Sequence, residues 1–166
     1  KRCVGLPGQT LEIKDRIIYL DGKPNKEPDN VQYNYLVELT GPLPEEFRRE
    51  IGLSDEDYRI LYQYGYCPLS RPMKKAMEAR PDLVKSVALM DEVHDRLLYP
   101  LNGNKHWTCD NYGPIWIPAP GATITLNLEN LPVYERCIKE YEGNTLEVTD
   151  KGDILINGEK ATSYNL

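Results

Sequence analysis

The feature that most constrains the fold of this chain is a hairpin pattern that occurs twice. The segment 8–23 (GQTLEIKDRIIYLDGK) recurs at 143–159 (GNTLEVTDKGDILINGE), with one added residue, Gly152, in the second copy. In both copies apolar and polar residues alternate around a turn, and an Asp-Gly or Asn-Gly pair follows, which is typical of a β-hairpin. We therefore expect two related hairpin units bracketing the chain. The alternative is that two similar turns arose by convergence.

The likeness between the copies extends upstream, where residues 2–4 (RCV) match residues 136–138 (RCI) if one more residue is allowed in between. This match predicts a strand in the latter part of 131–141. The four-residue spacing of Val133, Cys137 and Tyr141 instead fits one face of a helix. Both alternatives stand for this segment.

Further strands are predicted where β-branched and aromatic residues are dense. The clearest is 30–39 (NVQYNYLVEL), which a Gly-Pro pair soon follows. The segments 115–117 and 124–128 have a similar composition. We favour a strand for 83–90 as well.

Helical patterns fill the segment between Pro44 and Pro81. Phe47 and Ile51 are four residues apart behind an acidic first turn, which indicates a helix. Ser54, with an acidic residue three positions later, is typical of a helix cap and predicts a second helix through Tyr62. A third helix is expected over 71–80, where a proline occupies the first turn.

Composition excludes several classes of function. The 166 residues carry a formal net charge of −6, with lysines and arginines scattered along the chain, which argues against nucleic-acid binding. No apolar run approaches the roughly 18 to 20 residues that cross a bilayer. The four cysteines have no metal-ligand spacing, so we expect no metal and no cofactor. Disulfides and buried free thiols both remain possible for them.

The motif that carries chemistry is KRCVGLPGQTLEI at 1–13. It resembles the lysine box of bacterial type I signal peptidases, in which a Lys-Arg pair and a Val-Gly-Leu-Pro-Gly-Asp turn precede a hairpin. The likeness continues through YLDGKP at 19–24, and 107–124 is similar to a segment of the longer, Bacteroidetes-type members. Gln9 stands where the family has Asp, so a charge-dependent role at that position is not expected.

The resemblance implies that Lys1 is the general base of a Ser/Lys dyad. A lysine at its reference pKa of about 10.4 is almost wholly charged near neutral pH, so desolvation must lower its pKa. A shift of about three units corresponds to about 4 kcal/mol. On a strand, Lys1 and Cys3 would share one face, which gives the lysine a small neighbour.

The family's nucleophile motif, Ser-x-Ser-Met-x-Pro, occurs nowhere in the chain. The serines are Ser54, Ser70, Ser86 and Ser163, and none has that context. The Gly-Asp-Asn-rich box of the family is absent as well. We expect this chain to be a piece of a longer protein and to have no peptidase activity by itself.

The expected fold is α+β and mainly β, a signal-peptidase-like complex β fold with two related hairpin units and a helical insertion. Its divisions are a β unit with the lysine box at 1–43, the insertion at 44–82 and a second β unit at 83–166, forming one compact domain. The parent enzyme would cleave signal peptides of exported preproteins at the periplasmic side of a bacterial inner membrane. Its anchor would lie outside this piece.

Two other classes of protein compete with this interpretation. A non-enzymatic extracytoplasmic protein-binding module could use the tyrosines of 58–66 as its contact surface, since tyrosine suits interfaces. Packing of these tyrosines onto the sheet is the simpler expectation. A cytoplasmic self-cleaving repressor domain is disfavoured, because the sequence has neither a helix-turn-helix nor an Ala-Gly cleavage pattern.

Overall fold

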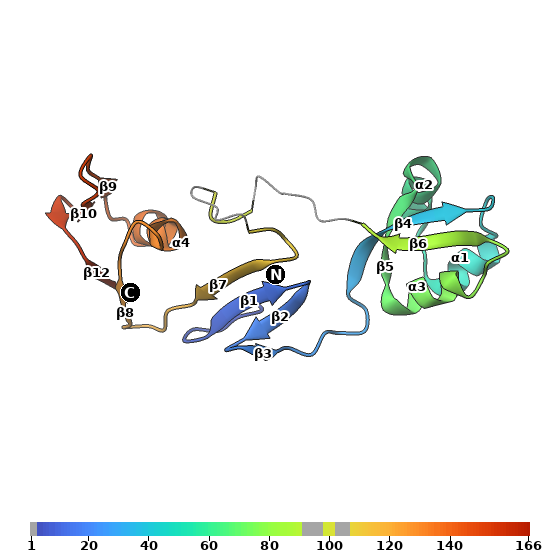
Figure 1. The fold of residues 1–166 in the computed structure, drawn as a ribbon, viewed down its shortest axis with the longest axis horizontal. Helices are drawn as coiled ribbons and strands as arrows, with labels where there is room; N and C mark the ends of the chain where they lie inside the picture. The colour runs from blue at the N-terminus through green and yellow to red at the C-terminus, as the bar shows by residue number, and fades with distance from the viewer. Residues whose placement is uncertain (1–2, 91–97, 102–106) are drawn as a thin grey trace. The chain divides into compact units, whose positions relative to one another are not determined.

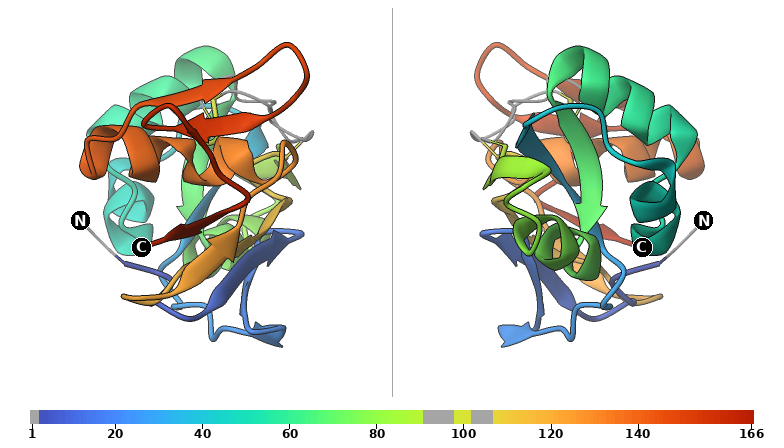
Figure 2. Two further views of the ribbon diagram at one scale, coloured as in Figure 1. Left: turned by 90° about the vertical axis from the view of Figure 1, so that its left-hand side faces the viewer. Right: turned by 90° about the vertical axis from the view of Figure 1, so that its right-hand side faces the viewer.

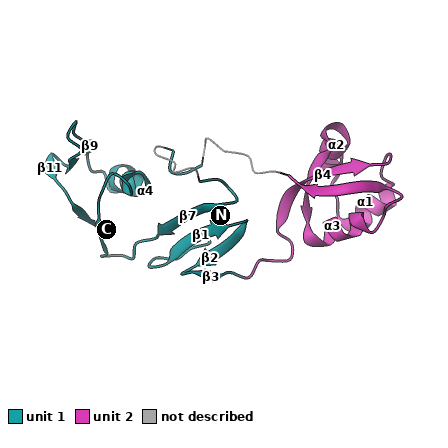
Figure 3. Cartoon of the chain, in the orientation of Figure 1, with its two compact units in different colours: residues 1–25, 92–166 teal, residues 26–91 magenta. Residues whose placement is uncertain are grey.

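The computed structural model describes residues 3–90, 98–101 and 107–166. The chain divides into two compact units (Figure 3), of which the first contains residues 1–25 and 92–166 and the second residues 26–91. The second unit thus includes strands on both sides of the segment 44–82.

A three-stranded antiparallel sheet forms the framework of the second unit (Figure 1). Its central strand is β4 (Gln32–Leu39), and its edge strands are β5 (Tyr66–Ser70) and β6 (Val84–Leu89), so that the order is β5-β4-β6. The predicted strand at 30–39 is confirmed, as is the strand at 83–90. Alternation along β4 explains its placement, because Tyr33, Tyr35 and Val37 are covered while the residues between them are exposed.

Three helices connect the strands of this sheet, at the places that the sequence predicts. They are α1 (Glu45–Ile51), α2 (Asp55–Tyr64) and α3 (Arg71–Glu78). Ser54 and Ser70 cap α2 and α3 by accepting hydrogen bonds from the backbone N–H groups of Asp57 and Met73. Each cap satisfies one of the N–H groups that a helix start leaves without a partner.

The core of the second unit lies between the sheet and these helices. Cys67, Leu69 and Met77 have no exposed surface, and Leu61 has 2%. Burial of an apolar side chain of this size stabilises a fold by about 1.5–3 kcal/mol, so this cluster is the main source of the unit's stability. The remaining buried members are Val37, Leu43, Phe47, Leu53, Met73 and Val84.

The first unit begins with the first copy of the repeated hairpin. Strands β1 (Thr10–Lys14), β2 (Ile17–Leu20) and β3 (Lys23–Pro24) form an antiparallel sheet, and β7 (Tyr112–Trp116) pairs with the outer edge of β1. The strands predicted at 8–22 and the strand predicted around 115–117 are confirmed.

The second copy forms a separate sheet from β9 (Leu146–Val148), β10 (Ile154–Ile156) and β11 (Glu159–Lys160). Nearby, β8 (Thr123–Thr125) pairs with β12 (Ser163–Asn165). Ile124, Ile138 and Ile154 are among the buried residues that join β8, the helical segment and β10 in one core. Figure 2 shows the ribbon of this part of the chain from two further sides.

Both copies of the repeat use the same register. Leu11 faces Leu20 in the first copy, and Leu146 faces Ile156 at the matching positions of the second. The pairs Glu12–Tyr19 and Ile13–Ile18 likewise match Glu147–Leu155 and Val148–Ile154. The two predicted hairpins are therefore confirmed, and their strands pair in the same register.

The turn chemistry of the two copies also agrees. The Asp21 carboxylate accepts a hydrogen bond from the backbone N–H of Thr10 at 2.8 Å, and the Asn157 side chain accepts one from Thr145 at 3.0 Å. Asp21 and Asn157 both have φ of 52°, a left-handed conformation that Asp and Asn tolerate better than other non-glycine residues. Gly152, the added residue, has φ of 81° and extends the preceding turn of the second copy.

The structure decides between the strand and the helix that the sequence left open for the segment 131–141. It forms helix α4 (Leu131–Arg136) and a π-helical turn (Cys137–Tyr141). The strand that the upstream match predicted in its latter part is therefore wrong. The physical reason is packing on one face, since Leu131 and Ile138, seven residues apart, are both buried against β8 and β10.

In class, the chain is a mixed α and β protein that consists mainly of antiparallel strands. The described residues include four α-helices. None of these helices is long and apolar enough to cross a membrane.

Candidate functional site

The expected catalytic base, Lys1, lies outside the described residues, as does Arg2. The description of the lysine box begins at Cys3, whose exposed thiol donates a hydrogen bond to the Gly5 carbonyl at 3.0 Å. The structure therefore describes the part of the lysine box that follows Arg2 in the sequence.

A reciprocal pair of hydrogen bonds builds the turn of the lysine box. The Gln9 backbone N–H donates to the Leu6 carbonyl at 3.1 Å, and the Leu6 N–H donates to the Gln9 side-chain oxygen at 2.9 Å. Gly8 supplies the left-handed residue of this turn, with φ of 88°. Gln9 thus closes the turn through an uncharged amide oxygen, so this position needs no carboxylate.

The lysine box lies against the residues that follow β7. The Gly8 N–H donates to the Ile117 carbonyl at 2.7 Å, and the Ile117 N–H donates to the Gln9 carbonyl at 2.8 Å. A Cβ at Gly5 would come within 2.4 Å of the Ile117 Cδ1, so only glycine fits there without a shift of Ile117. Two segments singled out in the sequence, 1–13 and 107–124, are thus brought together.

Another part of the segment 107–124 holds the turn between β1 and β2. Asp15 and Arg16 both have positive φ, of 48° and 71°. Their backbone N–H groups donate to the Asn111 side-chain oxygen at 3.1 Å and to the Asp110 carbonyl at 2.9 Å, and the Arg16 guanidinium also forms an ion pair with Asp110. Asp110 and Asn111 therefore stabilise a conformation that is costly for residues other than glycine.

Apolar side chains are exposed around the lysine box. Val4 is 44% exposed, Leu6 60% and Trp116 37%. Val4 and Leu6 belong to the lysine box, and Trp116 precedes Ile117, to which the box is hydrogen-bonded. Exposed apolar side chains offer surface that a further segment or a ligand can cover. Such coverage is what the desolvation of a lysine amine requires.

Two of the serines have structural roles as helix caps. Besides accepting the bond from Asp57 N–H, the Ser54 hydroxyl donates to the Asp57 carboxylate at 2.6 Å. The Ser70 hydroxyl is buried and accepts from the Met73 N–H. A cap hydroxyl is held by its own helix, so neither group is arranged as a nucleophile.

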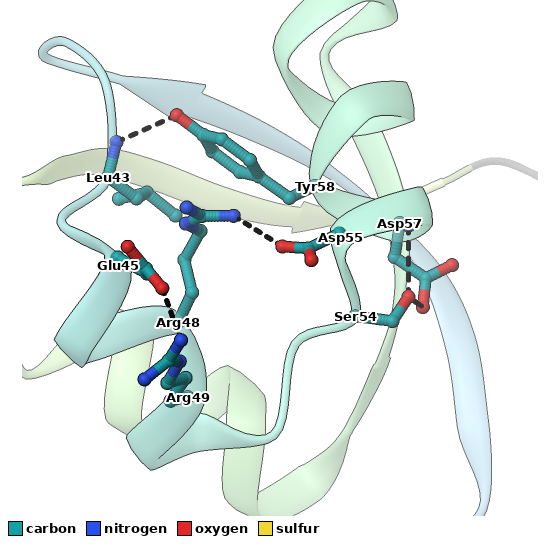
Figure 4. Close-up of polar contacts among 8 residues, drawn as sticks. All are labelled: Leu43, Glu45, Arg48, Arg49, Ser54, Asp55, Asp57 and Tyr58. Atoms are coloured by element: carbon teal, nitrogen blue, oxygen red, sulfur yellow. Dashed lines mark hydrogen bonds and ion pairs between the residues drawn. The ribbon is translucent and has the colours of Figure 1, made fainter.

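A second polar cluster joins α1 and α2 in the other unit (Figure 4). The Arg48 guanidinium donates to the Asp55 carboxylate at 2.8 Å and lies 4.2 Å from the centroid of the Tyr58 ring. The Tyr58 hydroxyl accepts a hydrogen bond from the Leu43 N–H at 3.1 Å. Arg48 is only 17% exposed, and its buried Nε makes no hydrogen bond to the described part of the chain.

A surface cavity of about 450 Å³ opens beside this cluster. Its lining consists of charged, aromatic and amide side chains, namely Arg48, Asp55, Tyr58, Arg59, Tyr62 and Gln63. Tyr62 is 62% exposed and Tyr64 61%, so the simpler expectation that all these tyrosines pack onto the sheet is wrong for these two. The sequence analysis predicted a contact surface for the tyrosines of 58–66, but it did not predict that Arg48 and Arg59 would line the same cavity.

The described residues hold no group of three or more His, Cys, Asp or Glu side chains that could bind a metal ion. Cys67 is fully buried, and burial raises the pKa of its thiol to about 12, so the group stays protonated and unreactive.

In comparisons with known proteins, the chain matches no family model, no curated protein and no solved structure.

Proposed function

We propose that this chain is the extracytoplasmic part, from the lysine box onward, of a type I signal peptidase. In this proposal the parent enzyme cleaves signal peptides from exported preproteins with a Ser/Lys dyad, and Lys1 is its general base. The chain supplies no nucleophile, so the serine comes from a segment outside it. The observation that carries the proposal is the sequence of the lysine box, KRCVGLPGQ at 1–9.

The geometry around the box supports this assignment. The turn closed by Leu6 and Gln9 is attached to Ile117, which fixes the described part of the lysine box, and a general base needs such a fixed support for positioning. The exposed side chains of Val4, Leu6 and Trp116 offer apolar surface in the described part of the lysine box and in β7. Covered by the serine-bearing segment, that surface would lower the pKa of the Lys1 amine by desolvation.

The chemistry follows from a neutral amine. Lys1 accepts the proton of the serine hydroxyl while the serine oxygen bonds to the scissile carbonyl carbon, and the ammonium then returns a proton to the leaving amine as the peptide bond breaks. Water hydrolyses the resulting ester with the same amine as base. No metal or cofactor takes part in these steps.

The experiment compares two proteins in the cleavage of a purified preprotein. One is this chain alone, and the other is the full product of the reading frame that encodes it, in detergent. We expect cleavage by the full product and none by the chain alone. Cleavage by the chain alone, or a full product without a serine-bearing segment and without activity, would contradict the proposal.

A protein-binding module is the second candidate, because the exposed Tyr62 lines one cavity together with Arg48 and Arg59. Tyr and Arg are the residues enriched in interface hot spots. The same reading frame separates the two candidates, since a binding module predicts no serine nucleophile anywhere in it.

A further inference from the structure

The outer edge of β9 differs from the matching edge in the other copy of the repeat. In the first copy β7 pairs with β1, so that Leu11 faces Ile115 and Ile13 faces Tyr112. In the second copy β9 is the edge of its sheet, and no described strand pairs with its outer side. The same hairpin is therefore completed by a fourth strand in one place and open in the other.

Backbone groups point outward from this edge. Thr145 and Thr149 hydrogen-bond to Asn157 and Asp153 on the β10 side. Along an antiparallel pair of strands, every second residue points its backbone N–H and C=O groups at the partner strand. Glu147, midway between the two threonines, therefore also bonds toward β10, whereas the N–H and C=O groups of Leu146 and Val148 face away from β10. These two residues match Leu11 and Ile13, the positions that carry the pairing with β7.

Exposure agrees with a missing strand. Ile13 and Glu12 are half-buried in the first copy, while Val148 is 48% exposed and Glu147 is exposed in the second. The turn differs too, because Asp110 and Asn111 hold the β1–β2 turn and no described segment does so at 150–152.

Charge at the edge selects what can pair with it. In the first copy Glu12 forms an ion pair with Lys14 at 2.9 Å, but Thr149 replaces that lysine in the second copy. The carboxylate of Glu147 consequently has no ion pair among the described residues. A basic side chain opposite Glu147 would supply the missing charge, since cross-strand pairs of opposite charge stabilise a sheet.

We propose that the edge of β9 binds an extended peptide segment of a partner protein, which adds an antiparallel strand and places a basic residue between two apolar ones against Glu147. Apolar residues of the partner pack beside Leu146 and Val148, as Ile115 and Tyr112 do in the first copy. Addition of a strand to an open edge is a known mode of peptide recognition.

A second copy of this chain is a poorer occupant. Antiparallel pairing of two β9 strands with Leu146 opposite Val148 would place Glu147 directly across from Glu147 of the other copy. Like charges in that position destabilise a sheet. The inference does not depend on the proposed enzymatic function, because it uses only the comparison between the two hairpins.

The test uses the whole chain and two acetylated, amidated peptides, Thr-Val-Lys-Val-Thr and Thr-Val-Glu-Val-Thr, followed by NMR titration of the amide resonances. We expect shifts at Leu146 and Val148, and about tenfold tighter binding of the lysine peptide, which corresponds to about 1.4 kcal/mol. Equal affinities, no shifts, or shifts located elsewhere would overturn the proposal.

Two variants with matched controls sharpen the test. Val148→Pro removes an outward N–H without removing a bond to β10, and we expect it to weaken binding of the lysine peptide at least about tenfold, whereas Val148→Thr binds normally. Glu147→Gln, which preserves the fold, is expected to abolish the preference for the lysine peptide, and Glu12→Gln to leave it unchanged. Unchanged preference in Glu147→Gln refutes the charge argument.

Analytical ultracentrifugation tests whether a second copy of this chain, and not a partner peptide, occupies the edge of β9. A dimer of the unmodified chain that Val148→Pro dissociates would identify a second copy as the partner and overturn the proposal. We expect the sedimentation of both proteins to be the same.

Discussion

The turn at Asp21 offers a quantitative test of how the repeated hairpin is stabilised. Its carboxylate accepts the Thr10 N–H at 2.8 Å, and its backbone is left-handed, with φ of 52°. Replacement by Ala removes the acceptor. It also leaves a side chain in the left-handed conformation without the local hydrogen bond that makes this conformation tolerable for Asp. Replacement by Gly removes the acceptor only, and Asn keeps an acceptor of similar reach.

The magnitudes follow from these two contributions. Loss of the hydrogen bond costs about 0.5–1.5 kcal/mol. Ala in the left-handed region costs about 1 kcal/mol more. We therefore expect Asp21→Ala to lower the free energy of unfolding of the first unit by about 2 kcal/mol, Asp21→Gly by about 1 kcal/mol and Asp21→Asn by less than about 0.5 kcal/mol.

Urea denaturation followed by tryptophan fluorescence measures this change, because Trp107 and Trp116 both belong to the first unit. Equal destabilisation by Ala and Gly would refute the conformational contribution. An Asn variant as unstable as the Ala variant would refute the role of the side-chain acceptor. Asn157→Ala serves as the parallel test in the second copy.

Three further predictions concern the second unit. Met77→Ala leaves a cavity in the core and is expected to cost about 2–5 kcal/mol, against less than about 1.5 kcal/mol for Met77→Leu, by urea denaturation followed by circular dichroism. Because burial raises the pKa of the Cys67 thiol from 9.0 to about 12, the unfolded chain loses that proton first, so stability is full below pH 9 and falls as the pH rises toward 12; in Cys67→Val this part of the pH dependence disappears. Ser54→Ala removes the cap of α2 and is expected to cost about 1 kcal/mol, whereas Ser54→Asp retains most of the stability.

Local patterns in the sequence predicted most elements, because local chemistry determines them. The Asp21-Gly22 and Asn157-Gly158 pairs require left-handed turns, and alternation around them sets the strands. The Ser54 cap was found in the same way, since a hydroxyl three residues before the backbone N–H group that donates to it is a local arrangement. These features need no knowledge of distant parts of the chain.

Elements that depend on distant contacts were predicted less well. Residues 136–138 match residues 2–4 in sequence, but burial of Leu131 and Ile138 against β8 and β10 makes the segment 131–141 helical. The pairing of β7 with β1 joins residues about a hundred positions apart, and no local pattern reveals it. The Arg48–Tyr58 contact is hidden for a similar reason, because it forms only when α1 and α2 pack together.

The candidate site likewise has parts that local sequence predicts and parts that depend on distant contacts. The sequence singled out the segments 1–13 and 107–124, and only the structure shows that hydrogen bonds of Gly8 and Gln9 to Ile117 join them. The open edge of β9 could be inferred only after both hairpins were compared in three dimensions. Its one sequence signal is the replacement of Lys14 by Thr149 at matching positions.

The measurement that tests the central claim most directly is preprotein cleavage by the full product of the reading frame with Lys1→Met. Removal of a general base lowers the rate by about 10²–10⁴-fold, and we expect a loss in this range for Lys1→Met. Lys85→Met, on β6 of the other unit, is the matched control and is expected to cleave at the unmodified rate. Cleavage by Lys1→Met at the rate of the unmodified protein would contradict the assignment of Lys1 as the base.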